Sequence, residues 1–286
     1  MKFSLAPQGQ LHRLLREHRF ALVSAEVLEQ IPSECRPLST AAEALRDSDE
    51  LLPKLIDLAE LTQDSRNTLL DACVGPSDST PTVTVLLDSN AQPSTMAAHL
   101  GRAQIAQSTG GEKAWLRLHD PRVWVQLNRV LSDAQLNSLM GPSQRWTFFF
   151  DGRWFTQENT GAREIGNRFD ARSWSALERI GIVNRVLARM QSEVETMDSI
   201  HCTSVTADQL AQRAIEHHHI SSVDDQVEFC LLGLRVHSQF DEHPQVRKIL
   251  ARVADDPSAF DELLANNEIY WRNISQTLNM TGEATT

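Results

Sequence analysis

Hydrophobic and polar positions alternate most regularly over residues 115–154, where the pattern predicts a strand, two helices and a hairpin. The stretch 115–118 is apolar apart from one arginine and suits a short strand. Asp120 followed by Pro121 predicts a helix start, because aspartate accepts hydrogen bonds from free N–H groups and proline at the first helical position has no N–H to leave unpaired. Apolar residues then recur at helical spacing, so this helix should pack against the rest of the domain.

The second half of this stretch predicts another helix and a β-hairpin. Ser132 and Gln135 fit a capping box, and a Gly-Pro pair ends the helix that they begin. Residues 145–150 are mostly aromatic, which favours a strand. The Asp-Gly pair that follows is a strong signal for a two-residue hairpin turn.

Towards the N-terminus the periodicity is weaker, but strands and helices can still be placed. It predicts a strand at 21–24, another at 82–87, and helices at 11–18, 50–61, 64–73 and 94–106, with a surface loop at 76–81. This order of elements is typical of an α+β domain with a mixed sheet and flanking helices.

From Ala171 onward the pattern is helical almost throughout. It predicts one helix, or a kinked pair around Gly181, over 174–190. Further helices are predicted over 206–217, 223–236, 244–253 and 259–275, with a frayed end over 280–286. The preceding stretch, 157–169, is polar and contains glycine, which is typical of a linker. We therefore predict two domains, an α+β domain over 1–160 and an all-helical C-terminal lobe over 161–286.

Composition and charge narrow the class of protein. Hydrophobic residues make up 41% of the chain and charged residues 23%, which are ordinary globular values. No apolar stretch is long enough to cross a bilayer, and polar residues interrupt any signal-peptide core near the N-terminus. We therefore expect a cytoplasmic protein with no membrane partner.

The formal net charge of −11 disfavours nucleic acid as a partner, because binding to phosphates depends on lysine and arginine. The same charge favours encounter with a basic protein surface. The 4 cysteines form no CxxC pair, so neither a zinc site nor a disulfide framework is predicted.

No catalytic or cofactor motif is recognisable. The chain lacks a P-loop, a GxGxxG turn, a nucleophile elbow and an HExxH pair, so we expect no catalytic residue and no cofactor. His217, His218 and His219 invite a metal hypothesis, but three successive side chains on a helix point in different directions. No metal site is therefore expected.

Five residues are candidates for contact with a protein partner. Adjacent His119 and Asp120 resemble a catalytic pair, which leaves a hydrolase as the alternative reading, but Asp120 is better explained as a helix cap. Arg122 needs a carboxylate partner, either within the fold or on another protein. Tryptophan and arginine are favoured at interfaces. The candidates are Arg117, Asp120, Arg122, Arg153 and Trp154.

Several sequence motifs resemble one known family. LRLHDPRV at 116–123, GPSQRW at 141–146, FFDGRW at 149–154 and FDEHPQVRKIL at 240–250, with Trp271 downstream, are similar to the effector adaptors of the type VI secretion system. These are chaperone-like proteins that carry a domain of unknown function and are often encoded beside an effector. The resemblance implies that the chain holds a cognate effector and helps to load it onto the VgrG spike or its PAAR tip. The region from about Asp170 matches more loosely and is expected to contribute to the choice of cargo.

Overall fold

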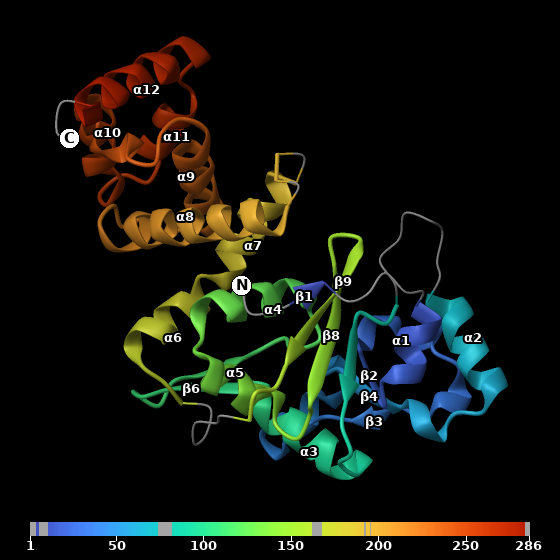
Figure 1. The fold of residues 1–286 in the computed structure, drawn as a ribbon. Coiled ribbons are helices and arrows are strands. Elements are labelled where there is room, and N and C mark those ends of the chain that lie inside the picture. Colours follow the sequence, from blue (N-terminus) through green and yellow to red (C-terminus); the bar gives the residue numbers. More distant parts are fainter. Residues whose placement is uncertain are drawn as a thin grey trace. The chain divides into compact units, whose positions relative to one another are not determined.

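The computed structural model describes residues 4–5, 11–73, 82–161, 168–191, 193–194 and 196–283. The chain forms two compact units, Met1–Trp174 and Ser175–Thr286 (Figure 1). The first contains sheets and helices and the second is helical, which confirms the α+β class with a helical C-terminal region. The loop predicted at 76–81 and the last three residues of the predicted frayed end lie outside the described residues.

A seven-stranded sheet forms the centre of the first unit. Its order is β1-β9-β8-β5-β2-β4-β3, and every neighbouring pair is antiparallel. The strands are β1 (Ser4–Leu5), β2 (Phe20–Val23), β3 (Leu38–Ser39), β4 (Lys54–Asp57), β5 (Val85–Asp88), β8 (Arg145–Phe150) and β9 (Arg153–Glu158).

The main sheet was predicted to be mixed, but its described strands are all antiparallel. Among the described strands, parallel and antiparallel pairing occur together only in a small second sheet. There β10 (Arg168–Phe169) runs parallel to β6 (Ile105–Ser108), which pairs antiparallel with β7 (Lys113–Trp115). The continuous apolar runs in β2 and β5 reflect burial on both faces, which is common in parallel sheets but does not fix strand direction. Because β10 belongs to the first unit, that unit extends beyond the division predicted after residue 160.

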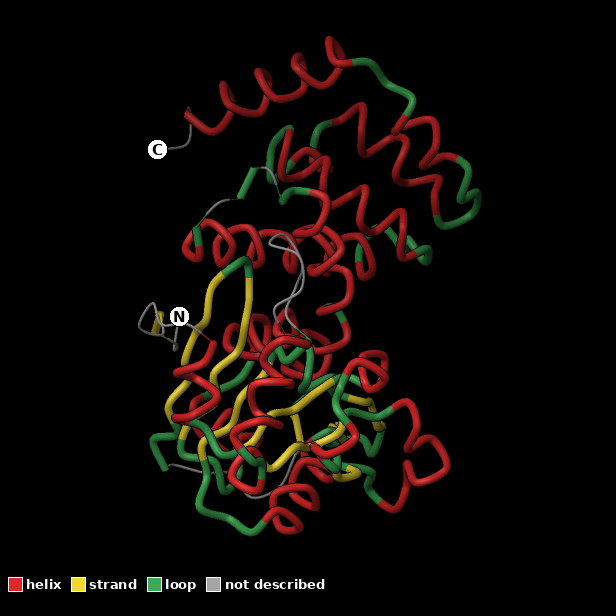
Figure 2. The backbone as a smooth tube through the Cα atoms, turned by 90° about the vertical axis from the view of Figure 1, so that its right-hand side faces the viewer, coloured by secondary structure: helices red, strands yellow, loops and turns green. Residues whose placement is uncertain are grey.

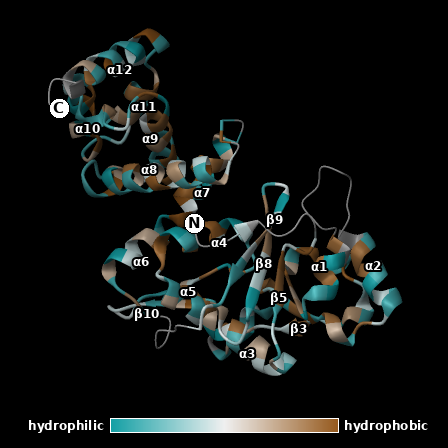
Figure 3. Cartoon of the chain, in the orientation of Figure 1, coloured by the Kyte–Doolittle hydropathy of each residue, from teal (hydrophilic) through white to brown (hydrophobic). Residues whose placement is uncertain are grey.

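Helices cover both faces of the main sheet (Figure 1). On one face, α1 (Leu11–Glu17) and α2 (Gln63–Cys73) contribute to an apolar cluster with the sheet. On the other, Trp124 of α4 (Pro121–Val130) lies 4.4 Å from Trp146 of β8 between ring centroids. Helices α3 (Pro93–Ala103) and α5 (Asp133–Met140) complete the unit. Figure 3 shows hydrophobic residues concentrated on the central strands, as this layering requires.

The locally encoded turns and caps form as predicted. Asp120 caps α4, with Pro121 in the first turn, and Ser132 and Gln135 form the capping box of α5. Asp151 and Gly152 have φ values of 48° and 73° at the turn between β8 and β9. Positive φ at both central residues is what a type I′ hairpin requires.

Three elements predicted for the first unit were placed wrongly. The helix predicted over 50–61 is replaced by a 3-10 helix, η3 (Glu43–Leu51), and the buried strand β4. Lys54 and Asp57 are buried there because they pair with Asp49 at 2.6 Å and Arg19 at 3.3 Å. The helix predicted to reach residue 106 ends at 103, where β6 soon follows, and the strand predicted at 115–118 lies at 113–115.

The second unit is a set of helices joined by loops, red and green in Figure 2. Its described helices are α7 (Ile180–Arg189), α8 (Met197–Glu216), α9 (Val223–Arg235), η5 (Phe240–Glu242), α10 (Pro244–Val253), α11 (Ala259–Leu264) and α12 (Glu268–Glu283), while α6 (Ala171–Glu178) begins in the first unit. The helix predicted over 259–275 is therefore two, and α8 begins earlier than predicted. Among the described helices, none has the length and apolar character needed to cross a membrane.

Candidate partner-binding surface

The segment from Trp115 to Arg122 joins the small sheet to α4. Strand β7 is terminal in that sheet, and Trp115, its last residue, is 41% exposed. The indole N–H of Trp115 donates to Oε1 of Gln104 at 3.2 Å, and the amide of Gln104 donates to Oγ1 of Thr40 at 3.1 Å. These bonds orient an aromatic side chain that stays partly in solvent.

Asp120 is the centre of a charged cluster on this segment. Its carboxylate accepts from the backbone N–H of Arg122 at 3.0 Å, from Nε of Arg122 at 3.0 Å and from Nη2 at 2.8 Å. A guanidinium nitrogen of Arg117 lies 3.8 Å from Oδ2 of Asp120. The carboxylate partner predicted for Arg122, either within the fold or on another protein, is therefore one within the fold, that of Asp120.

Burial and hydrogen bonding act in opposite directions on Asp120. Burial favours the neutral acid, but the hydrogen bonds and positive charge of Arg122 outweigh it and hold the pKa of the Asp120 carboxyl below its ordinary value. The carboxylate is therefore charged at neutral pH, and it holds the exposed Arg122 side chain in one orientation. Arg117 is exposed and only loosely paired, so it keeps donors for an outside acceptor.

Among the described residues, no hydrogen bond or ion pair joins His119 to Asp120. Its side chain is buried, with 7% of the residue exposed, and Nδ1 has no hydrogen-bond partner. Burial, with a smaller contribution from the charge of Arg117, lowers the pKa of His119 to about 4. The ring lies 6.0 Å from that of Trp115, and its backbone carbonyl accepts from Thr84. This arrangement is typical of a neutral histidine packed in the interior, here in the turn between β7 and α4.

Arg153 and Trp154 lie elsewhere, on β9 of the main sheet. Trp154 stands opposite Phe149 in the β8–β9 register, with ring centroids 5.3 Å apart, and packs on the apolar cluster beneath α1 and α2. Arg153 is exposed beside the hairpin turn. Within the described residues, no hydrogen bond, ion pair or ring contact links either residue to Arg117 or Arg122. The structure thus brings together three of the five candidates.

Two members of this surface were missed by sequence reasoning. Trp115 was predicted only as a strand residue, although its position between Lys113 and Arg117 was a signal of exposure. Glu26, in the 3-10 helix η1 (Ala25–Gln30), acts electrostatically on both His119 and Arg122. No local pattern could have connected Glu26 with a segment so far along the chain.

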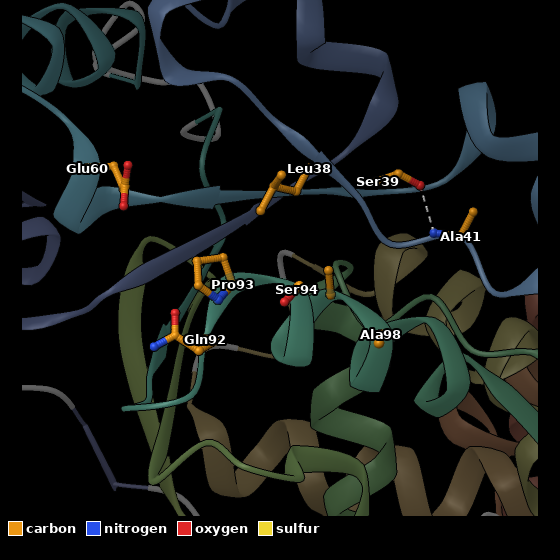
Figure 4. A pocket seen from close by; sticks show the side chains of 9 residues that line it. Leu38, Ser39, Ala41, Glu60, Gln92, Pro93, Ser94 and Ala98 are labelled. Atoms are coloured by element: carbon orange, nitrogen blue, oxygen red, sulfur yellow. Dashed lines mark hydrogen bonds between the residues drawn. The ribbon is translucent and has the colours of Figure 1, made fainter.

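A pocket of about 650 Å³ lies between β3 and the start of α3 (Figure 4). Leu38 and Pro93 face each other across it, and Glu60 is its only titratable lining residue. Ser39 is engaged, since its hydroxyl donates to Asp49 at 2.5 Å and accepts from the N–H of Ala41 at 3.0 Å. The other polar side chains of the lining are those of Gln92 and Ser94.

The histidine run of the helical unit makes structural contacts. Nε2 of His218 lies 3.0 Å from Oδ2 of Asp241, and Arg213 pairs with the same carboxylate at 2.9 Å. Over the described residues, no three His, Cys, Asp or Glu side chains converge in a way that could hold a metal ion.

A family described as "Domain of unknown function (DUF4123)" matches residues 20–138, which is less than half of the chain. This domain family is associated with adaptors of the type VI secretion system. The match runs from β2 into α5 and includes the whole segment from Trp115 to Arg122. Neither the curated proteins nor the solved structures gave a match.

Proposed function

We propose that this chain is a cytoplasmic adaptor or chaperone of the type VI secretion system. It binds a cognate effector and helps to load it onto the VgrG spike or the PAAR tip. It acts by recognition, without catalysis and without a cofactor. The observation that carries this proposal is the match of residues 20–138 to a domain family associated with such adaptors.

The chemistry of the surface at 115–122 supports a binding role. Tryptophan and arginine supply much of the energy of protein interfaces, and here both are exposed on one short segment. Asp120 fixes Arg122 through two side-chain hydrogen bonds, so little side-chain entropy remains to be lost when a partner binds. A partner segment with an apolar side chain for Trp115 and a carboxylate for Arg117 would complement this surface.

Deletion of the gene in its host tests the proposal. The secreted proteins of the deletion strain and its parent are compared by quantitative mass spectrometry. We expect one effector to disappear from the secreted fraction while other type VI substrates persist, and a plasmid copy of the gene to restore it. An unchanged set of secreted proteins would overturn the proposal.

The surface itself is tested with the double variant Trp115→Ala, Arg117→Ala and the effector so identified. Loss of an interface tryptophan commonly costs about 2 kcal/mol or more, so we expect affinity to fall at least roughly 30-fold. Arg16→Ala is the control, because Arg16 is an exposed arginine on α1. Equal affinity of the double variant and the wild type would place the effector site elsewhere on the chain.

A further inference from the structure

The helical unit carries a groove that the proposed function leaves without a role. It has a volume of about 470 Å³ and lies where α7 meets the end of α8 and the start of α9. This volume is in the range of about 300–1,000 Å³ that is usual for binding pockets.

Apolar side chains form one stripe of the groove. Ile182 is buried beneath it, while Ile215 and Val223 are 37% and 43% exposed. Ile215 lies on α8 and Val223 on α9, so two helices contribute exposed apolar side chains to the groove. Adjacent exposed hydrophobic side chains with a polar rim are typical of an interaction site.

Gly181 leaves the groove open on the α7 side. A Cβ atom placed on Gly181 would have no other atom within 4 Å. Gly233 of α9 differs, because a Cβ there would lie 2.3 Å from a methyl carbon of Leu210. Glycine at 233 is thus explained by packing between α8 and α9, whereas packing within the unit does not explain glycine at 181.

The rim of the groove is acidic. Its lining holds Glu178 and Glu216, the second of which accepts from Gln212, and two arginines. Each arginine pairs with a further carboxylate, Arg179 with Asp208 at 2.7 Å and Arg185 with Asp224 at 3.0 Å, so the acidic side chains outnumber the basic ones. The whole unit has 17 acidic and 9 basic residues, which gives it −8 of the net charge of −11. A basic partner is complementary to this surface.

The walls of the groove also indicate the conformation of the partner. They are formed by helices, whose backbone groups bond within each helix, and Ser222 caps the start of α9 by accepting from Asp225 N–H. The groove therefore offers side chains and no strand edge. An amphipathic helix laid into an apolar groove is the recognition mode that such walls fit.

We propose that this groove binds a basic amphipathic α-helix of a partner protein. The apolar face of that helix packs on Ile182, Ile215 and Val223, and its lysine or arginine residues face Glu178 and Glu216. The inference rests on the proposed function only in taking the partner to be a protein.

The first test uses a labelled peptide of about 18 residues, built from Leu, Lys and Ala in helical periodicity and long enough to form a helix. Its binding to the full-length protein is measured by fluorescence anisotropy. We expect saturable binding that weakens as ionic strength rises from about 0.1 M to about 1 M. A peptide with Glu in place of Lys should not bind, and equal binding of the two peptides would overturn the proposal.

Variants of the groove locate the binding. A Cβ on Gly181 would meet no neighbour, so we expect Gly181→Trp to place its indole in the groove and to weaken peptide binding at least about tenfold, whereas Gly181→Ala should leave it nearly unchanged. Glu216→Lys should also weaken binding, and Asp255→Lys, an equal charge change at an exposed site, should weaken it less. If Gly181→Trp fails to fold, Ile215→Glu replaces it as the groove variant in the same peptide-binding measurement. Wild-type affinity in the folded groove variants would refute the proposal.

Failure of the groove inference can be distinguished from failure of the proposed function. If an effector and VgrG co-purify equally with the wild type and with Gly181→Trp, the groove inference fails and the adaptor proposal stands. If neither protein co-purifies with the wild type, the adaptor proposal fails, while peptide binding still reports on the groove.

Discussion

At the scale of single residues, Asp120 combines a structural and a surface role in one carboxylate. It caps α4 through the N–H of Arg122 and also binds the guanidinium of the same residue. These roles can be separated by substitution, because serine retains capping ability but carries no charge.

We predict that Asp120→Ala lowers the free energy of unfolding by about 1–2 kcal/mol, because the cap and the ion pair are both lost. Asp120→Ser should recover roughly half of that loss, because its hydroxyl restores the cap. Urea denaturation followed by circular dichroism measures both values. Equal destabilisation by Ala and Ser would show that capping contributes nothing here.

His119 makes stability depend on pH. In the unfolded chain it takes up a proton near the ordinary pKa of 6.5, whereas in the fold its pKa is about 4. The unfolded state therefore binds more protons between these values, and stability falls as pH decreases from 6.5 to 4. Burial also lowers the pKa of His18, which adds to the same trend.

Between pH 6.5 and 4, the free energy of unfolding of His119→Gln should fall less than that of the wild type. We predict a difference of at most about 3 kcal/mol, because each pKa unit corresponds to about 1.36 kcal/mol. Urea denaturation of both proteins at a series of pH values measures this difference. A variant whose pH dependence matches that of the wild type would contradict a buried, neutral His119.

At the scale of elements, those encoded by adjacent residues could be predicted and those that depend on distant partners could not. The caps of α4 and α5 and the β8–β9 turn were recognisable because the residues that specify them are neighbours in sequence. Strand β4 was mistaken for helix because the ion pairs that allow Lys54 and Asp57 to be buried involve residues outside the strand. Strand β6 was missed because it follows α3 almost without a break.

The β8–β9 turn gives a test of backbone conformation alone. Gly152→Ala should lower the free energy of unfolding by about 1–2 kcal/mol, since alanine is strained at a φ of 73° while its Cβ would meet no neighbour. Asp151→Asn should be nearly neutral, because asparagine tolerates positive φ. Thermal denaturation compares the two variants, and a neutral Gly152→Ala would contradict the turn.

Two glycines of the helical unit should respond oppositely to alanine. Gly181→Ala should raise the free energy of unfolding by about 0.5–1 kcal/mol, because alanine favours helix and its Cβ enters open space. Gly233→Ala should lower it, because the Cβ would lie 2.3 Å from Leu210. Denaturant titration of both variants is the check, and destabilisation by Gly181→Ala would mean that the groove is closed.

At the scale of the whole molecule, the candidate surfaces differ in how far sequence could reveal them. Arg117, Asp120 and Arg122 are close in sequence, and the aspartate–proline cap already placed them at one junction. Glu26 and the groove beside Gly181 depend on segments that only folding brings together. The sequence gives the net charge of the chain, but the bounds of the two units are needed to show that most of this charge lies in the helical unit.

The adaptor function that we propose requires two kinds of partner, an effector and a component of the spike. The arginine and tryptophan surface lies in the first unit, and the acidic groove in the second. The first presents two exposed arginines and the second lies in a unit of net negative charge, a difference that would let them select different partners.

Quantitative co-purification tests adaptor function most directly. The tagged full-length protein is expressed in its native host, isolated under gentle conditions and analysed by mass spectrometry against a tag-only control. We predict that a toxin-like protein encoded by a neighbouring gene and a VgrG protein are recovered with it in comparable amounts. Recovery of the protein alone, together with a change in its melting temperature on addition of a small molecule, would contradict adaptor function and favour an enzyme.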